Sequence, residues 1–190
     1  MELMSVRQRV LVVAGVLAVL PIVPGIIVAA QKRIAGFIEP MPTAKLRQLF
    51  PQATAFTPRG DKDPLHFTAY AADPRAPGAK PIGFAFWTVD INPEELGYHG
   101  HIHMLVGMNM TGTLTGVIVD WNTEPYGDFS VEPPAFGAQF KGKSIRDPFV
   151  AGKDVDIVSR ATITVRAAAR TIRESSRSVA RALLTPEAVR

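Results

Sequence analysis

The longest hydrophobic run of the chain lies near its amino terminus. Residues 10–30 contain no charged side chain and have basic residues on both sides. A run of this length is sufficient for a helix to cross the hydrocarbon core of a bilayer, which takes about 20 residues. Small residues at positions 28–30 and prolines inside the run also fit a cleaved signal peptide. We therefore expect residues 1–35 to be a membrane anchor, with a signal peptide as the alternative.

The expected location of the protein follows from this amino-terminal segment. Basic residues flank it on both sides, so the positive-inside rule does not decide its orientation. Segments of either kind usually leave the following chain outside the cytoplasm. We expect a single-pass membrane protein whose domain lies on the periplasmic or extracytoplasmic side.

Residues 36–80 predict a short helix followed by a loop-rich connection. The stretch from Thr43 to Phe50 places apolar residues at helical spacing, and Thr43 is a candidate N-cap. The stretch that follows, residues 51–81, is rich in Pro, Gly, Asp and Ala, a composition typical of turns. Within it, residues 65–71 predict one short strand.

Residues 81–190 are expected to form the main domain. Residues 82–89, 101–110 and 113–121 are β-type runs separated by turn residues. The turn between the second and third runs is short enough for a hairpin, so we expect an antiparallel sheet. Residues 122–143 show too little periodicity to predict regular structure.

A helix is predicted after Thr164, ending near Pro186. Apolar or small residues recur there at steps of three and four and so share one helical face; they are Val165, Ala169, Ile172, Ser176, Val179 and Leu183. A second stripe consists of Arg166, Arg170, Arg173, Arg177 and Arg181. These arginines predict either a solvated flank or a surface for anionic lipid or an acidic partner. The expected fold class is α+β, an antiparallel sheet with the C-terminal helix packed on it, plus one amino-terminal transmembrane helix.

Composition narrows the chemistry that the chain can perform. Its 190 residues include no cysteine, which excludes disulfides, thiolate zinc sites, iron–sulfur clusters and a catalytic thiol. Any redox chemistry therefore needs a bound cofactor. The formal net charge of +4 is modest, and much of the positive charge lies in the last quarter, so we expect no nucleic-acid partner.

Few side chains form a catalytic or metal-binding pattern. His99, His101 and His103 would project from one face of an extended strand, but no carboxylate follows at short spacing to complete a metal site. We predict no metal ion, with the histidines as the alternative. Asp120 and Glu124 are candidate acids or bases, yet nothing pairs them with a nucleophile. Neither the dinucleotide-binding glycine motif nor the P-loop motif occurs.

Thr162 has the position of a functional hydroxyl, between an aliphatic stretch and the predicted helix. A hydroxyl there can cap the helix or present an oxygen to an anion at the positive end of the helix. The run from Asp154 to Thr164 also resembles the flavinylation motif of the FMN-binding domain family, commonly Ser-Gly-Ala-Thr-x-Ser/Thr. The matching positions are Ser159, Ala161, Thr162 and Thr164, and Arg160 stands where glycine is usual.

The resemblance to this family extends from about Leu46 to Leu184. The family includes the G and C subunits of the Rnf and sodium-pumping quinone reductase complexes. It also includes the periplasmic domain of the nitrous-oxide-reduction regulator NosR and its relative NirI, the type that this chain resembles most. The similar blocks are residues 49–53, 82–86, 97–100, 106–108, 112–116 and 140–143.

The resemblance implies a covalently bound cofactor. In such proteins a dedicated flavin transferase joins the FMN phosphate to the threonine hydroxyl, which implies FMN attached to Thr162 as a phosphoester. Around this acceptor the resemblance places Ser159, Arg160, Ala161 and Thr164. The residues that it places against the flavin ring are Glu124, Pro125 and Tyr126, with Phe140 and Lys141 as weaker candidates.

The function implied by the resemblance is electron transfer between membrane redox proteins. The flavin would supply the redox chemistry, and the protein its position and electrostatics. A membrane tether raises the local concentration of the flavin near its partners. We therefore expect an electron carrier, not an enzyme with a substrate of its own. The alternative is a non-redox accessory or regulatory module, anchored to the membrane, that retains the fold.

Overall fold

The structure is a computed structural model that describes residues 39–189. The anchor or signal peptide expected for residues 1–35 lies outside the described residues. Among residues 39–189, no helix is both long enough and apolar enough to span a membrane.

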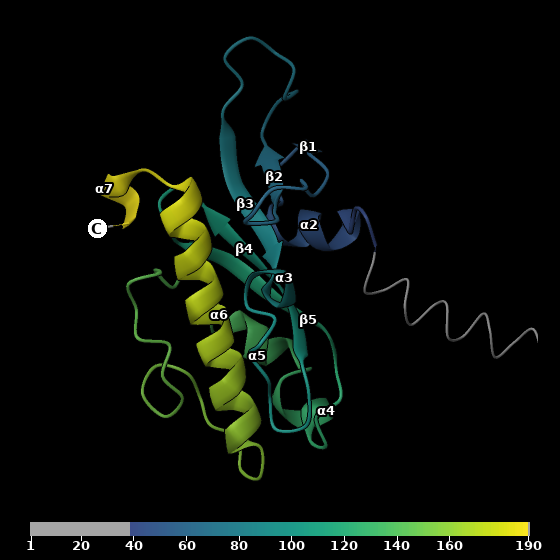
Figure 1. Cartoon of the computed structure of the whole chain (residues 1–190), viewed down its shortest axis with the longest axis vertical. Helices are drawn as coiled ribbons and strands as arrows, with labels where there is room; N and C mark the ends of the chain where they lie inside the picture. The colour runs from purple at the N-terminus through teal and green to yellow at the C-terminus, as the bar shows by residue number, and fades with distance from the viewer. Residues whose placement is uncertain (1–38, 190) are drawn as a thin grey trace, which may run out of the picture. The chain divides into compact units, whose positions relative to one another are not determined.

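Within residues 39–189, five antiparallel strands form one sheet, and their spatial order follows their order in the chain (Figure 1). They are β1 (Ala55–Phe56), β2 (Phe67–Tyr70), β3 (Pro81–Trp87), β4 (Ile102–Asn109) and β5 (Leu114–Asn122). The predicted antiparallel sheet is confirmed, and β2 to β5 lie where the hydrophobic pattern predicts strands. The pattern does not predict β1, because a strand of 2 residues holds no periodicity.

The residues of the turn between β4 and β5 explain why this hairpin can be predicted from the sequence. The side-chain oxygen of Asn109 accepts hydrogen bonds from the backbone N–H groups of Thr111, at 3.0 Å, and Thr113, at 2.9 Å. Gly112 adopts a φ of +77°, a left-handed conformation that costs glycine little. The turn therefore depends on residues that favour tight turns.

Several helices flank the sheet: α2 (Thr43–Leu49), α3 (Thr88–Ile91), α4 (Gly127–Ser130), α5 (Pro134–Ala138), α6 (Thr162–Leu183) and α7 (Pro186–Val189). The helix predicted near residue 43 is confirmed, but the capping role of Thr43 is wrong. Pro42 occupies the N-cap, and the Thr43 hydroxyl donates to the Met41 carbonyl. The absence of regular structure predicted for residues 122–143 is also wrong, since α4 and α5 lie there. Each is too short to show helical periodicity.

The long helix α6 crosses one face of the sheet (Figure 1). It begins at Thr162, earlier than predicted, so Thr162 is its first residue. The predicted apolar stripe is confirmed as buried, except that Leu183 is only partly buried. Further small residues are buried as well, and they let the helix approach closely; they are Ala167, Ala168, Thr171, Ser175 and Ala180.

The helix α2 covers the other face. Side chains alternate along the strands, so Phe84 and Phe86 of β3 join the core beneath α6, whereas Ala85 and Trp87 join the core beneath α2. The sheet therefore separates two apolar cores, and one helix packs on each of its faces, α6 on one and α2 on the other.

The arginine stripe of α6 is a solvated flank in part: Arg166, Arg170 and Arg181 are exposed, whereas Arg173 and Arg177 are partly buried. Arg170 forms an ion pair with Glu95, with 2.9 Å between its Nη2 and the carboxylate. Arg177 donates to the backbone carbonyls of Ile145, at 2.9 Å, and Asp147, at 3.0 Å. Members of the stripe therefore tie neighbouring loops to α6.

Candidate functional site

A cavity of about 490 Å³ lies at the amino-terminal end of α6. Its volume is within the range of small-molecule sites, roughly 300–1,000 Å³. It is lined by Tyr98, Pro125, Tyr126, Arg160, Ala161, Thr162, Ile163 and Thr164. Three segments that are distant in sequence therefore meet around one space. Most of the residues predicted for the site are among them, whereas Ser159 is exposed and is not part of the lining.

The end of α6 presents unused hydrogen-bond donors to this cavity. Within the described part of the chain, the backbone N–H groups of Thr162, Ile163 and Thr164 donate to no acceptor, and no side chain caps the helix. Ala161 occupies the N-cap, so Thr162 does not cap the helix with its hydroxyl. Free N–H groups and the helix dipole together favour an anion at this position.

Glu124 does not line the cavity, although it was predicted to lie against a bound ring. Its side chain is buried behind the cavity wall, with 8% of its surface exposed. One carboxylate oxygen accepts from Tyr98 N at 2.9 Å and Thr164 Oγ1 at 2.5 Å. The other accepts from His99 N at 2.9 Å and Gly100 N at 3.2 Å. We call this carboxylate and its four donors the Glu124 clasp.

The clasp keeps Glu124 ionised. Burial raises the pKa of the Glu124 carboxyl, but the hydrogen bonds from Thr164, His99, Tyr98 and Gly100 outweigh burial and hold this pKa below its ordinary value. Such bonds favour the charged form because they are made to a carboxylate that accepts and does not donate. A buried negative charge therefore sits behind the wall of the cavity without facing it.

Exposed apolar side chains surround the mouth of the cavity. Tyr98 is 64% exposed, Ile163 is 58% exposed and Tyr126 is 44% exposed. The rings of Tyr126 and Phe129 lie 5.4 Å apart between their centroids. A group of exposed apolar side chains around a cavity is typical of a binding site. The site therefore combines an anion-binding end with a surface suited to a flat, apolar ring.

Arg160 lies in the cavity wall with a backbone that non-glycine residues rarely adopt. Its φ is +70°, in the left-handed region that costs an L-residue roughly 1–2 kcal/mol. The glycine that the related motif has at this position would adopt this conformation without that cost. At the same time, Arg160 brings an exposed cationic side chain to the cavity, where it would attract an anion.

Replacing Arg160 by glycine is expected to stabilise the protein by about 1 kcal/mol, because the left-handed conformation is less costly for glycine. Urea unfolding of the cofactor-free protein measures this change. The matched control is Arg160→Ala, which removes the same charge but keeps a Cβ, and should give no stabilisation. Equal stability of the two variants would contradict the assignment of strain to this residue.

The three histidines separate in the structure. His99 is exposed in the turn before β4, and His101 Nδ1 lies 3.3 Å from the Glu95 carbonyl. His103 is buried and stacks on Trp87, with 4.4 Å between ring centroids. Among the described residues, no group of three or more His, Cys, Asp or Glu is arranged to hold a metal ion.

The two carboxylates considered as acids or bases lie in different environments. Asp120 forms an ion pair of 2.7 Å with Lys45 of α2 and lies 3.5 Å from His103 Nδ1. Trp87, which stacks on His103, belongs to the core beneath α2, whereas Glu124 contacts Thr164 of α6. The structure therefore does not bring Asp120 and Glu124 together into one site.

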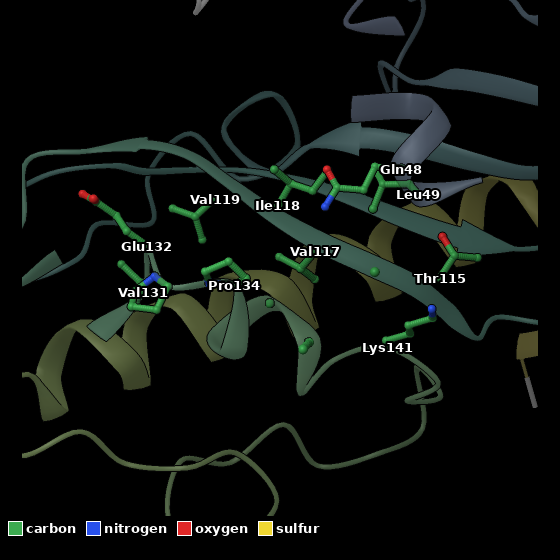
Figure 2. A pocket seen from close by; sticks show the side chains of 14 residues that line it. Gln48, Leu49, Thr115, Val117, Ile118, Val119, Val131, Glu132, Pro134 and Lys141 are labelled. Carbon is green, nitrogen blue, oxygen red and sulfur yellow. The ribbon is translucent and has the colours of Figure 1, made fainter. Parts of the chain in front are cut away.

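The weaker candidates, Phe140 and Lys141, lie away from the cavity at α6. Phe140 is fully buried in the core and has no exposed surface. Lys141 lines a second cavity, of about 430 Å³, between β5, α2 and α5. Figure 2 shows Lys141 and Thr115 at one end of this cavity and Glu132 at the other. The two cavities share no lining residue.

Two lining residues, Tyr98 and Ile163, were not predicted as part of the site. Tyr98 lies in a turn between two glycines, which the sequence showed only as one block of a family resemblance. Ile163 occupies the variable position of the motif. Nothing in the sequence around Ile163 indicates a role at the site. Only the folded structure shows that its side chain is exposed and lines the cavity.

Comparison with known proteins identifies the domain that contains this site. Residues 97–176 match a protein family described as the FMN-binding domain. This span contains every residue that lines the cavity at α6. A comparison with curated protein sequences gave no match. The match covers less than half of the chain, and it supports an FMN-binding domain at residues 97–176 with a flavin-binding function.

Proposed function

We propose that the protein is an electron carrier that holds FMN covalently on Thr162 and exchanges electrons with membrane redox proteins. The observation that carries this proposal is the position of Thr162, which is the first residue of α6 and lies in the wall of the 490 Å³ cavity. The match of residues 97–176 to the FMN-binding domain supports the identity of the cofactor.

The amino-terminal end of α6 fits the phosphate of FMN. The N–H groups of Thr162, Ile163 and Thr164 are free of acceptors in the described residues. A phosphate esterified to Thr162 would lie next to these donors and at the positive end of the helix dipole. The cationic side chain of Arg160, in the same wall, adds favourable charge.

The rim of the cavity fits the flavin ring. Tyr98, Tyr126 and Ile163 expose apolar surface around the opening, and aromatic side chains stack favourably on a flat ring system. Contacts of this kind would exclude water from one face of the ring and limit its motion. FMN, when bound, supplies the transfer of one or two electrons.

The proposed attachment requires an activated flavin donor. A phosphoester bond forms between Thr162 Oγ1 and the phosphorus of FMN. The bond between that phosphorus and the pyrophosphate oxygen of the donor would break, a nucleoside monophosphate would leave, and the proton of the threonine hydroxyl would pass through a base of the flavin transferase to solvent. Within the described residues, Thr162 Oγ1 has no basic side chain hydrogen-bonded to it, so we assign activation of the hydroxyl to a separate flavin transferase.

The proposal includes a membrane tether formed by the amino-terminal segment and a domain on the extracytoplasmic side. The uncharged run at residues 10–30 supports the tether. A tether would hold the flavin close to membrane donors and acceptors, which raises their effective concentration. Two separate experiments test these points. Extraction of membranes at alkaline pH tests the anchor, and protease treatment of intact cells tests the side on which the domain lies.

Replacing Thr162 by valine is expected to abolish covalent flavin. The full chain would be produced in a host that expresses a flavin transferase, and its membranes separated by denaturing electrophoresis. The wild-type band should fluoresce, and the Thr162→Val band should be dark because its side chain has no hydroxyl to esterify. The control Thr171→Val removes a hydroxyl of α6 that donates to Ala167 O, outside the cavity lining, and should remain fluorescent.

Two results would overturn parts of this proposal. A dark wild-type band, together with an intact mass equal to that of the unmodified chain, excludes covalent attachment. A fluorescent band whose flavin absorbance does not respond to chemical reductants would favour the non-redox accessory module instead.

A further inference from the structure

The Glu124 clasp joins the three segments that form the cavity at α6. Its donors come from the turn at Tyr98–Gly100 and from Thr164 in the first turn of α6. Glu124 itself directly precedes Pro125 and Tyr126, which line the same cavity. Within the described residues, the carboxylate is thus bonded to, or covalently next to, every segment of the lining.

The absence of a side chain at Gly97 lets the Glu124 carboxylate lie close to the turn. A Cβ on Gly97 would lie 2.5 Å from Glu124 Oε1 and 2.7 Å from Glu124 Cδ, which is closer than atoms can approach. Glycine at position 97 therefore allows the carboxylate to reach the backbone N–H groups that follow it. At the other end of the segment, Glu124 N donates to Asn122 Oδ1 at 2.9 Å, which fixes the exit from β5.

Thr164 is the only member of the clasp that lies on α6. It is two residues from Thr162, and its hydroxyl points back to Glu124, away from solvent, with 3% of the residue exposed. The bond to a buried carboxylate is charge-assisted and therefore strong. It fixes where the first turn of α6 begins relative to the turn at Tyr98–Gly100, and with it the position of Thr162.

We infer that Glu124 and Thr164 are positioning residues for flavin attachment: through the hydrogen bond between them they hold Thr162 Oγ1 in the cavity where the FMN phosphate must meet it. This inference rests on the proposed attachment to Thr162. It gives the Thr164 hydroxyl, the last of the motif, a role of its own, which is to anchor the helix start and not to contact the cofactor.

The test compares the rate of flavin attachment in matched variants of the full chain. Thr164→Val and Glu124→Gln are expected to slow attachment about tenfold, the effect of losing one charge-assisted hydrogen bond. Thr164→Ser keeps the hydroxyl and should restore most of the wild-type rate. Thr171→Val removes another buried hydroxyl of α6, which donates to Ala167 O at 2.9 Å, away from the clasp; its rate should be that of wild type.

A second measurement does not depend on flavin. Amide hydrogen exchange in the cofactor-free protein should show that His99 and Gly100 lose protection in Glu124→Gln and, to a lesser degree, in Thr164→Val, but not in Thr171→Val. The proposed attachment fails if the wild-type protein takes up no covalent flavin. In that case the exchange data alone test whether Glu124 and Thr164 hold the turn at Tyr98–Gly100. The inference fails if these amides stay protected in Glu124→Gln, or if wild type is flavinylated and Thr164→Val matches its rate.

Discussion

Replacing Phe140 by alanine is expected to lower the free energy of unfolding by about 3–5 kcal/mol. Phe140 has no exposed surface, and its ring lies between those of Phe136, at 5.2 Å, and Phe149, at 5.9 Å, measured between centroids. Alanine would leave a cavity and remove both aromatic contacts. Because the backbone around α5 is fixed by the sheet on one side, the site cannot collapse to fill that cavity.

The rigidity of that site has a direct structural cause. A Cβ on Gly137 of α5 would lie 2.2 Å from the Val117 carbonyl oxygen of β5, so helix and strand are already in backbone contact. The matched control is Phe129→Ala, which removes a phenylalanine that is 44% exposed and should change stability by less than about 1 kcal/mol. Urea unfolding of both cofactor-free variants measures the difference, and similar losses would contradict the assignment of Phe140 to the core.

Acidification is expected to destabilise the protein in two steps, near neutral pH and again in strong acid. The first step comes from His103. Burial lowers the pKa of His103 below its ordinary value of 6.5, and this effect outweighs the opposite effect of Asp120. The unfolded chain therefore takes up a proton as the pH falls through about 6.5 while the folded chain does not, and stability falls.

The second step comes from carboxylates that the fold keeps ionised. The pKa of Glu124 lies below its ordinary value of 4.5, because the hydrogen bonds of the clasp outweigh burial. The pKa of Asp154 is likewise lowered from 3.8, since bonds from Val150, Lys143 and Phe149 outweigh burial. Stability from both groups is present above these ordinary values and is lost as the pH falls through the lower folded-state values.

Glu124→Gln separates the clasp from the other titrating groups. At neutral pH the free energy of unfolding of this variant should be lower by about 1.5–3 kcal/mol. The reason is that the amide NH₂ of glutamine cannot accept the hydrogen bonds that one carboxylate oxygen accepts in the wild type. The deficit should shrink in acid, where the wild-type carboxyl is protonated too. Asp154→Asn should also reduce the acid step, but it should leave the hydrogen bonds of the Glu124 clasp intact. A constant difference between Glu124→Gln and wild type from pH 7 to pH 2 would contradict an ionised Glu124.

The sheet and the helix α6 could be predicted from the sequence because both contain long periodic patterns. Residues 82–89, 101–110 and 113–121 alternate or are continuously apolar, and the turn residues between them are distinctive. The helices α4 and α5 could not be predicted, since four or five residues do not complete a periodic pattern. Their positions depend instead on packing against β5 and α6.

The residues of the sequence itself located the candidate site at Thr162 and its neighbours in the chain, and the family resemblance added Pro125 and Tyr126. The hydrogen bond between Thr164 and Glu124 joins residues 40 positions apart, and no local spacing encodes such a contact. The family resemblance implied that Glu124, Pro125 and Tyr126 all contact the flavin ring. In the fold, the chain turns between them, so Pro125 and Tyr126 reach the cavity while Glu124 points into the protein.

The order of the strands bears on where the proposed acceptor residue lies relative to the sheet. Each strand pairs with the next along the chain, from β1 to β5, so every strand pairing joins neighbours in the sequence and closes only a short loop. The wall that contains Thr162 belongs to α6, which follows all five strands. The residue proposed to receive FMN therefore lies outside the sheet, and the pairing of the five described strands does not depend on it.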